Sequence, residues 1–169
     1  MTTKRITDSY EQYIYDFMRD IYVICPSCGG QGLVKSPAFD VRNKEEQGIK
    51  FICASCGHSK RLDEKPVAVL SGSAHNVITG RYLIIGAAID PYFHLPLWLT
   101  TNCCDHLLWA YNYEHLDFLQ RHVASKLRER DTQNMLNKSL GSRLPKWMTS
   151  KKNREAVLKG IEHLAKKSG

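Results

Sequence analysis

Two short cysteine motifs are the residues of this sequence best suited to chemistry. Each reads Cys-x-x-Cys-Gly, one at 25–29 and the other at 53–57, and 24 residues lie between the inner cysteines. A turn of this spacing directs two thiolates toward one point, and the glycine after it permits a backbone conformation that bulkier residues resist. Two such turns complete a tetrahedral shell of four sulfurs. The pattern predicts one structural Zn²⁺ with four ligands: Cys25, Cys28, Cys53 and Cys56.

The same four thiolates leave two other interpretations open. Rubredoxin-like iron is the main alternative metal, and ordinary buried cysteines without a metal are the third possibility. Because four protein ligands leave no open position for water or substrate, the ion is expected to support folding rather than catalysis. His58 follows the second motif directly. It can replace a ligand, but with four thiolates present we expect it beside the ion or at the surface.

The compartment expected from the sequence agrees with a metal site. The first residues lack the apolar core of a secretory signal, and no stretch approaches the roughly 20 apolar residues of a membrane helix. We therefore expect a cytoplasmic protein that does not bind membranes. Thiols stay reduced in the cytosol, so paired Cys-x-x-Cys motifs indicate metal rather than disulfides.

The periodicity of apolar residues predicts an α+β fold in three segments. Apolar side chains recur at helical spacing between Thr7 and Asp20, which predicts an N-terminal amphipathic helix over 1–20. Short β-branched and aromatic runs at 21–24, 32–35, 49–52 and 58–62 predict an antiparallel ribbon over 21–65 that carries the cysteines. The third segment, 66–169, is expected to be mixed to largely helical and to pack against the ribbon.

Within the third segment, two kinds of element are expected. The runs 67–70 and 82–85 are apolar enough for buried strands. A helix is predicted over 112–130 with Asn112 as its N-cap, and a last helix from about Ser150, which Pro145 should separate from the preceding chain.

The stretch from Ile21 to about Leu62, with its two Cys-x-x-Cys-Gly motifs, resembles the zinc-ribbon superfamily, including the ribbons of the transcription-factor-IIB type. The resemblance covers about a quarter of the chain. It implies a scaffold that binds nucleic acids or docks proteins, and it implies no reaction. The remainder is similar to bacterial proteins that are characterised only by containing such a ribbon.

Positive charge is concentrated at the C-terminal end of the chain. The net charge is +7; residues 1–120 hold 11 Lys/Arg against 13 Asp/Glu, whereas residues 121–169 hold 13 against 4. This asymmetry predicts contact with nucleic acid or another acidic partner, and a solvated helical surface is the plain alternative. The candidate contact residues mix cations with one aromatic ring: Arg143, Lys146, Trp147, Lys151, Lys152 and Arg154.

Other residues of chemical interest have simpler explanations. Cys103 and Cys104, with His106 and His94, can be read as a second metal or redox site, but adjacent cysteines do not form the usual chelating turn and core packing is favoured. A nucleophile pair of Cys104 and His106 is favoured less. The aromatic run 91–99 is expected in the core, with a peptide or base groove as the minor alternative.

These observations predict a protein that is not an enzyme and has no small-molecule substrate. No phosphate-binding glycine loop, hydrolase elbow or open metal-ligand set is present in the sequence. Two functions remain close. In the first, the basic C-terminal region binds DNA or RNA. In the second, the protein binds one protein partner as a regulator or inhibitor, for example as an immunity protein that neutralises a toxin.

Overall fold

The computed structural model describes residues 12–40, 48–125 and 139–167, and it shows the α+β fold that the sequence predicts. Contacts group the chain into two compact units. We call Arg19–Trp98 the sheet unit, and Met1–Met18 together with Leu99–Gly169 the helical unit. This grouping places residues 66–98 with the ribbon segment, whereas the sequence assigned them to the third segment. The three-segment division itself stays a prediction.

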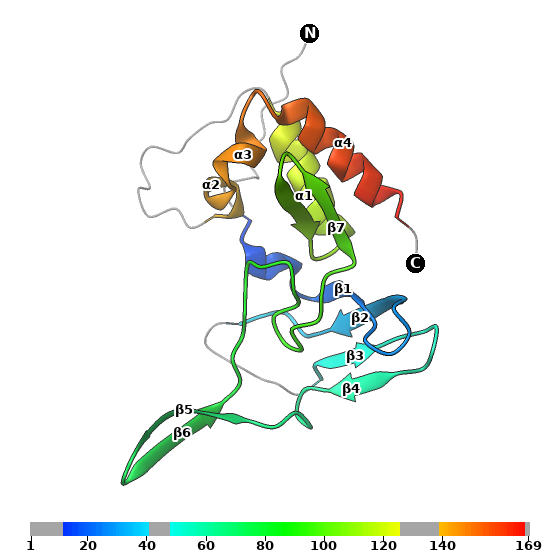
Figure 1. Ribbon diagram of the computed structural model, residues 1–169. Helices are drawn as coiled ribbons and strands as arrows, with labels where there is room; N and C mark the ends of the chain where they lie inside the picture. Colours follow the sequence, from blue (N-terminus) through cyan, green and yellow to red (C-terminus); the bar gives the residue numbers. More distant parts are fainter. Residues whose placement is uncertain (1–11, 41–47, 126–138, 168–169) are drawn as a thin grey trace. The chain divides into compact units, whose positions relative to one another are not determined.

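A four-stranded antiparallel sheet forms the centre of the sheet unit (Figure 1). Its strands follow one another in chain order: β1 (Asp20–Ile24), β2 (Gln31–Lys35), β3 (Lys50–Ile52) and β4 (Ser59–Arg61). Alternate residues are buried, as a sheet with one covered face requires. The fully buried side chains of this face include Ile21, Val23, Val34 and Phe51. All four predicted ribbon strands are confirmed.

The last residues of the sheet unit pair with the outer edge of β1. The Ile24 N–H donates to the Pro96 carbonyl at 2.8 Å, and the Trp98 N–H donates to the Tyr22 carbonyl at 2.9 Å. Leu97, between them, forms a bridge with Val23 and is fully buried. The two ends of this unit therefore lie side by side.

Asp90 holds the loop that leads to this pairing. Its buried carboxylate accepts three backbone N–H bonds, from Tyr92 at 2.9 Å, from Phe93 at 2.7 Å and from Leu95 at 2.6 Å. Burial raises the pKa of Asp90, and the three N–H donors oppose that rise. The aromatic run 91–99 thus forms an ordered loop that starts on a buried carboxylate, and Tyr92 and Leu97 contribute to the core, as expected.

A separate two-stranded hairpin, β5 (Ala68–Ser73) and β6 (Asn76–Gly80), belongs to the same unit. The prediction that 67–70 and 82–85 are buried strands is wrong. The first run enters β5 but is exposed, and the second is not a strand, with Tyr82 60% exposed. The physical reason is that a short apolar run predicts a preference for burial, whereas no described residue of the sheet unit forms a second layer over this hairpin.

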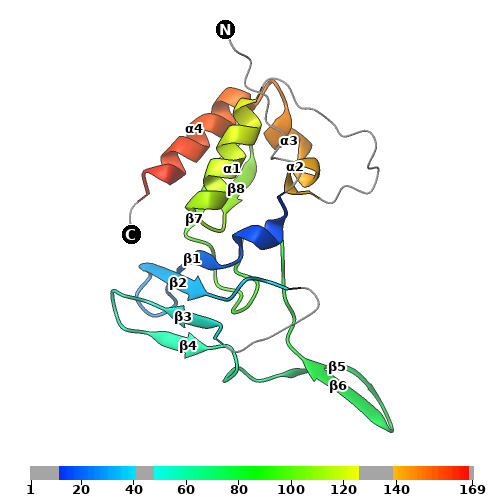
Figure 2. The same cartoon turned by 180° about the vertical axis from the view of Figure 1, so that it is seen from behind.

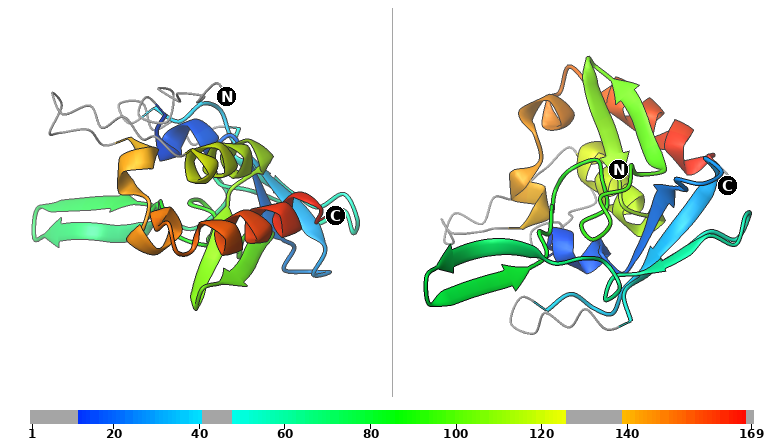
Figure 3. Two further views of the ribbon diagram at one scale, coloured as in Figure 1. Left: turned by 90° about the horizontal axis from the view of Figure 1, so that it is seen from above. Right: turned by 60° about the horizontal axis from the view of Figure 1, so that its bottom comes forward.

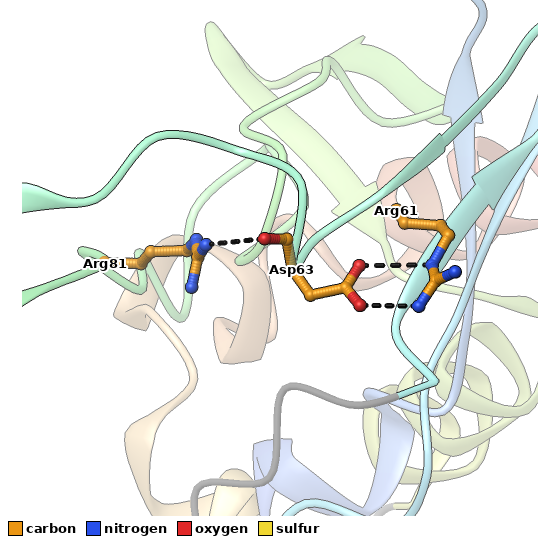
Figure 4. Close-up of polar contacts among 3 residues, drawn as sticks. All are labelled: Arg61, Asp63 and Arg81. Atoms are coloured by element: carbon orange, nitrogen blue, oxygen red, sulfur yellow. Dashed lines mark hydrogen bonds and ion pairs between the residues drawn. The ribbon is translucent and has the colours of Figure 1, made fainter.

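Arg81 joins the base of this hairpin to the turn after β4 (Figure 4). Its guanidinium donates to the carbonyls of Asp63, at 3.3 Å, and Lys65, at 3.2 Å. The carboxylate of Asp63 accepts in turn from two guanidinium nitrogens of Arg61 on β4, Nε and Nη2. These contacts fix the base of the hairpin against the end of the four-stranded sheet.

In its described residues, the helical unit contains a second hairpin and four α-helices, of which α1 and α4 are the long ones (Figure 2). Its elements are β7 (Leu99–Cys103), β8 (His106–Ala110), α1 (Tyr113–Ala124), α2 (Leu140–Arg143), α3 (Lys146–Thr149) and α4 (Arg154–Ala165). Helices α1 and α4 pack side by side, and α4 also contacts β7. Gly160 permits α4 to lie close to the β7–β8 hairpin, because a Cβ there would lie 2.9 Å from Leu108 Cδ2 on β8.

The predicted N-terminal helix is wrong in the part that the structure describes. Only one 3-10 turn forms, over Ile14–Phe17, and the chain enters β1 at Asp20. Strand β1 pairs with β2 from Asp20 onward, so the end of the predicted helix lies in the sheet. The helical pattern before it is too short to form a stable helix by itself. The earlier part, residues 1–11, lies outside the described residues.

The two long predicted helices are confirmed with shorter bounds. Asn112 caps α1, and its side-chain oxygen accepts the His115 N–H at 2.9 Å. Helix α1 ends at Ala124, and residues 126–130 of the prediction lie outside the described residues. Helix α4 begins at Arg154 rather than Ser150, and Pro145 precedes the separate helix α3, as predicted.

His115 is a core residue of the helical unit. Its ring stacks on Phe17 at 5.0 Å between centroids, and its Nδ1 accepts the Tyr111 N–H at 3.2 Å. Burial lowers the pKa of His115 to about 3. His122 is buried as well, so both histidines belong to the core of the helical unit.

The stability of the helical unit should therefore fall in acid. The unfolded His115 takes up a proton near its ordinary pKa of about 6.5, but the folded one does so only near 3. Acidification from about pH 7 to about pH 5 then costs about 2 kcal/mol of unfolding free energy through this residue. Urea unfolding followed by circular dichroism should show that acidification lowers the unfolding free energy of His115→Gln less than that of the wild type. His163→Gln, at an exposed position of α4, is the control. Equal losses in all three chains would contradict this account.

Candidate metal centre

Four cysteine sulfurs meet at one end of the sheet unit and can hold a metal ion. The ligand atoms of Cys25, Cys28, Cys53 and Cys56 all lie within 4.8 Å of one another. Cys25 Sγ is 3.7 Å from Cys56 Sγ, and Cys28 Sγ is 3.6 Å from Cys53 Sγ. A tetrahedral Zn²⁺ with Zn–S bonds of about 2.3 Å places its sulfurs about 3.8 Å apart. The spacing and the donor type therefore fit Zn²⁺.

The two cysteine turns have the same backbone geometry. In the first, the Gly29 N–H donates to the Cys25 carbonyl at 2.9 Å, and the Cys25 N–H donates to the Gly30 carbonyl at 2.8 Å. The second turn repeats both bonds at 3.0 and 2.8 Å, with Cys53 in the place of Cys25. The same pair of backbone hydrogen bonds therefore closes each turn.

Glycine is required at the end of both turns. Gly29 has a φ of +72° and Gly57 a φ of +74°, in the left-handed region that other residues avoid. Nothing lies within 4 Å of a Cβ built at either position. The requirement is therefore conformational and not one of space, as the sequence predicted.

The strands position one cysteine of each turn inside the unit and leave the other at the surface. Cys25 directly follows β1 and Cys53 directly follows β3, and each is 1% exposed. Cys28 and Cys56, at the far ends of the turns, are exposed. The site is thus half inside the protein, and its outer side faces solvent.

The thiols affect one another's ionisation. The backbone N–H of Cys56 is the main cause that lowers the pKa of Cys53, to about 6. For Cys28, the Gly30 N–H lowers the pKa, but the sulfurs of Cys53 and Cys56 raise it, and the result is about 12. Four thiolates this close repel one another, and a bound cation removes that repulsion. Metal binding and deprotonation of the four thiols therefore favour each other.

His58 lies outside the cluster of four sulfurs. It is half-buried, with its ring 5.6 Å from that of Phe51. Its carbonyl accepts the Cys53 N–H that closes the second turn. His58 therefore supports the turn through its backbone, in agreement with the expected position beside the site.

The other candidate cysteines form a turn in the helical unit. Cys104 and Asp105 have φ values of 52° and 60° and connect β7 to β8 as the two central residues of a tight hairpin. Cys103 is buried, and burial raises the pKa of its thiol to about 11, which makes a poor nucleophile. Across the described residues, the four-cysteine cluster is the group with metal-ligand geometry. The core-packing interpretation of Cys103 is the one that the structure favours.

The basic candidates lie along consecutive elements of the helical unit, from α2 through α3 to α4 (Figure 3). Arg143, Lys146, Lys151 and Lys152 are exposed. Arg154 is half-buried, and its buried Nε has no hydrogen-bond partner among the residues that the structure describes.

Trp147 stacks on a side chain of its own unit. Its ring stacks on the His106 ring, with centroids 4.7 Å apart and planes inclined by 12°. One ring face is therefore covered by a side chain of the same unit.

Sequence reasoning missed a cavity of about 590 Å³ in the sheet unit. Its lining is mainly apolar and comes from β5–β6 and from the chain around the sheet; it includes Phe39, Ile49, Leu62, Leu70, Ile78 and Tyr92. The only signal for it was the pair of apolar runs at 67–70 and 82–85, which were expected to be buried.

Among the described residues, no helix is long and apolar enough to cross a membrane. Comparisons of the chain with protein-family models, with curated proteins and with solved structures gave no match. What the protein does must therefore be inferred from its own residues.

Proposed function

We propose that this chain is a non-catalytic zinc-ribbon protein of the transcription-factor-IIB type that binds nucleic acid through its basic C-terminal region. The sulfur spacing supports the zinc part, because two opposite pairs 3.6 and 3.7 Å apart suit a tetrahedral ion. Four ligands leave the ion no open position, so its role is structural. The proposal places the protein in the cytoplasm, where thiols stay reduced.

The basic surface supports the nucleic-acid part. Residues 139–167 hold 8 Lys/Arg against 2 Asp/Glu. Lys159 pairs with Glu155 at 3.3 Å, whereas the side chains of Lys146, Lys151 and Lys152 extend into solvent. Exposed cations of this density attract the phosphate backbone and carry little sequence information. The expected ligand is therefore the phosphate backbone of DNA or RNA, without strong sequence preference.

Neutralising three of these cations should weaken nucleic-acid binding. In the triple variant Lys146→Gln, Lys151→Gln, Lys152→Gln, each lost phosphate contact should reduce the slope of log K against log salt by about 1. We expect the affinity at low salt to fall by about 10- to 100-fold. Fluorescence anisotropy with labelled single- and double-stranded DNA and RNA, over a salt series, measures both quantities.

The sheet unit offers a matched control. Lys35, Lys50 and Lys60 are exposed lysines of its strands, and changing all three to glutamine alters the net charge by the same amount. This control should retain nearly all affinity. Equal losses in both triple variants would mean that net charge alone drives binding, and absence of binding at low salt would reject the nucleic-acid proposal.

The alternative function is that of a protein-binding regulator or inhibitor, such as an immunity protein that neutralises a toxin. The observation that favours it is the exposed apolar hairpin β5–β6 beside the 590 Å³ cavity. A pulldown from cell extract that recovers one protein at near-equal stoichiometry, together with no nucleic-acid affinity, would support this alternative.

A further inference from the structure

The β5–β6 hairpin exposes apolar side chains in a stretch without charge. Residues 66–80 contain no Asp, Glu, Lys or Arg, although 24% of the chain is charged. Val69 is 64% exposed and Val77 60%. An exposed apolar surface of this kind marks an interaction site more often than a solvated one.

Both faces of the hairpin are apolar. On one face, Val69 and Val77 flank Gly72, whose Cβ position lies 3.8 and 3.9 Å from their methyl groups. On the other face, Leu70 covers Gly80 and lines the cavity together with Ile78. A two-stranded sheet is marginally stable in water by itself. The hairpin therefore needs a cover that the described residues of the sheet unit do not supply.

The two edges of the hairpin differ. The register between β5 and β6 shifts between Val69 and Ser71, so β5 carries an irregularity at Leu70, and Pro66 precedes the strand. Bulges and prolines disrupt further strand pairing. Strand β6 (Asn76–Gly80) has no irregularity, and its other edge pairs with no strand of the described chain. It is the edge that can accept another strand.

We propose that β6 is the dimerisation edge of this protein, where two copies pair antiparallel about a two-fold axis to form a four-stranded sheet. Antiparallel pairing of a strand with its own copy is self-complementary and closes after two chains. The irregular β5 edges then lie outermost and prevent further growth.

A second copy fits this surface better than a charged partner. Nucleic acid needs cations, which 66–80 lacks. Two chains of net charge +7 can approach most closely where neither carries charge. The uncharged segment 66–80 supplies 15 residues, fewer than the about 20–30 residues that each side of a standard interface uses, so the dimer should be weak. This inference does not depend on the proposed nucleic-acid function.

The test measures the mass of the full, zinc-loaded chain by sedimentation velocity over a dilution series. We expect a dimer that dissociates on dilution. Val77→Lys and Thr79→Lys each bring two like charges together beside the axis, and each should raise the dissociation constant by about 100-fold or more. Leu107→Lys is the control, because Leu107 is an exposed apolar residue of the other two-stranded hairpin.

Two further measurements separate loss of pairing from loss of folding. Zinc content and the circular dichroism spectrum should be unchanged in the lysine variants. The dissociation constant of the wild-type dimer should change little with salt. A wild-type chain that stays monomeric at high concentration overturns the proposal, as does a dimer that survives both lysine substitutions. A monomer that binds a different protein through this hairpin overturns it too.

Discussion

A chain with Cys53 replaced by serine is expected to lose the fold of its sheet unit. Cys53 is buried and lies 3.6 Å from Cys28 Sγ, so its loss removes an inner ligand and leaves a buried hydroxyl. Structural zinc contributes about 10–16 kcal/mol to folded small domains at neutral pH, which exceeds the stability of most domains. The zinc content should fall from about one Zn²⁺ per chain to well below one. Amide hydrogen exchange over 19–98 should become fast.

The control for this change is Cys104→Ser. Cys104 lies in the β7–β8 turn outside the cluster, so zinc content and exchange should match the wild type. A chelator should reproduce the Cys53→Ser result, and added Zn²⁺ should reverse it. Iron in the site would be recognised by visible absorption of the purified chain. A Cys53→Ser chain with full zinc content and slow exchange would refute the four-sulfur site.

The second large effect is expected for Gly32→Ala on β2. A Cβ at Gly32 would lie 2.4 Å from Phe51 Cε2 and 3.0 Å from Phe51 Cζ. Phe51 is fully buried, so its ring cannot move into solvent to make room. Overpacking of this kind costs about 1–3 kcal/mol, and the upper end is expected because the ring spans the centre of a small sheet. Urea unfolding of the zinc-loaded chain measures the loss.

A matched control and a rescue test the cause. Gly72→Ala also adds a methyl group in a strand, but its Cβ would meet Val69 and Val77 at 3.8 and 3.9 Å, which is ordinary contact. It should change stability by less than about 0.5 kcal/mol. Adding Phe51→Leu to Gly32→Ala should recover part of the loss, because the smaller side chain makes room. If Gly32→Ala and Gly72→Ala have equal effects, the loss comes from glycine itself and not from the Phe51 ring.

The parts of the fold that the sequence predicted are those set by local signals. The spacing of Cys25 and Cys28, with glycine after them, identifies a turn regardless of what surrounds it. Asn112 predicts the start of α1 because its side chain can bond the N–H three residues on, and it does so to His115. Both the metal centre and the two long helices could therefore be predicted.

The parts that failed depend on distant contacts. Leu70 and Tyr82 belong to apolar runs suited to burial, but whether a layer covers these runs is decided by other elements of the sheet unit. The sequence did not identify Asp90 as the residue that holds the loop. Its three hydrogen-bond donors are backbone N–H groups, and only the folded loop brings them to the carboxylate. His115 could not be distinguished from an exposed histidine until Phe17 was known to stack on it.

The pairing of both ends of the sheet unit also affects a part of the protein that never touches the metal. The helical unit is built from two pieces of chain that residues 19–98 separate, so its folding must close a loop of 80 residues. When the sheet unit is folded, the Trp98 N–H lies 2.9 Å from the Tyr22 carbonyl, and the loop is already closed. Each halving of loop length is worth about 0.6 kcal/mol, so a reduction from 80 residues to a handful is worth about 2 kcal/mol. Metal uptake by the four cysteines would then strengthen the helical unit through chain connectivity alone, as an entropic effect without any contact.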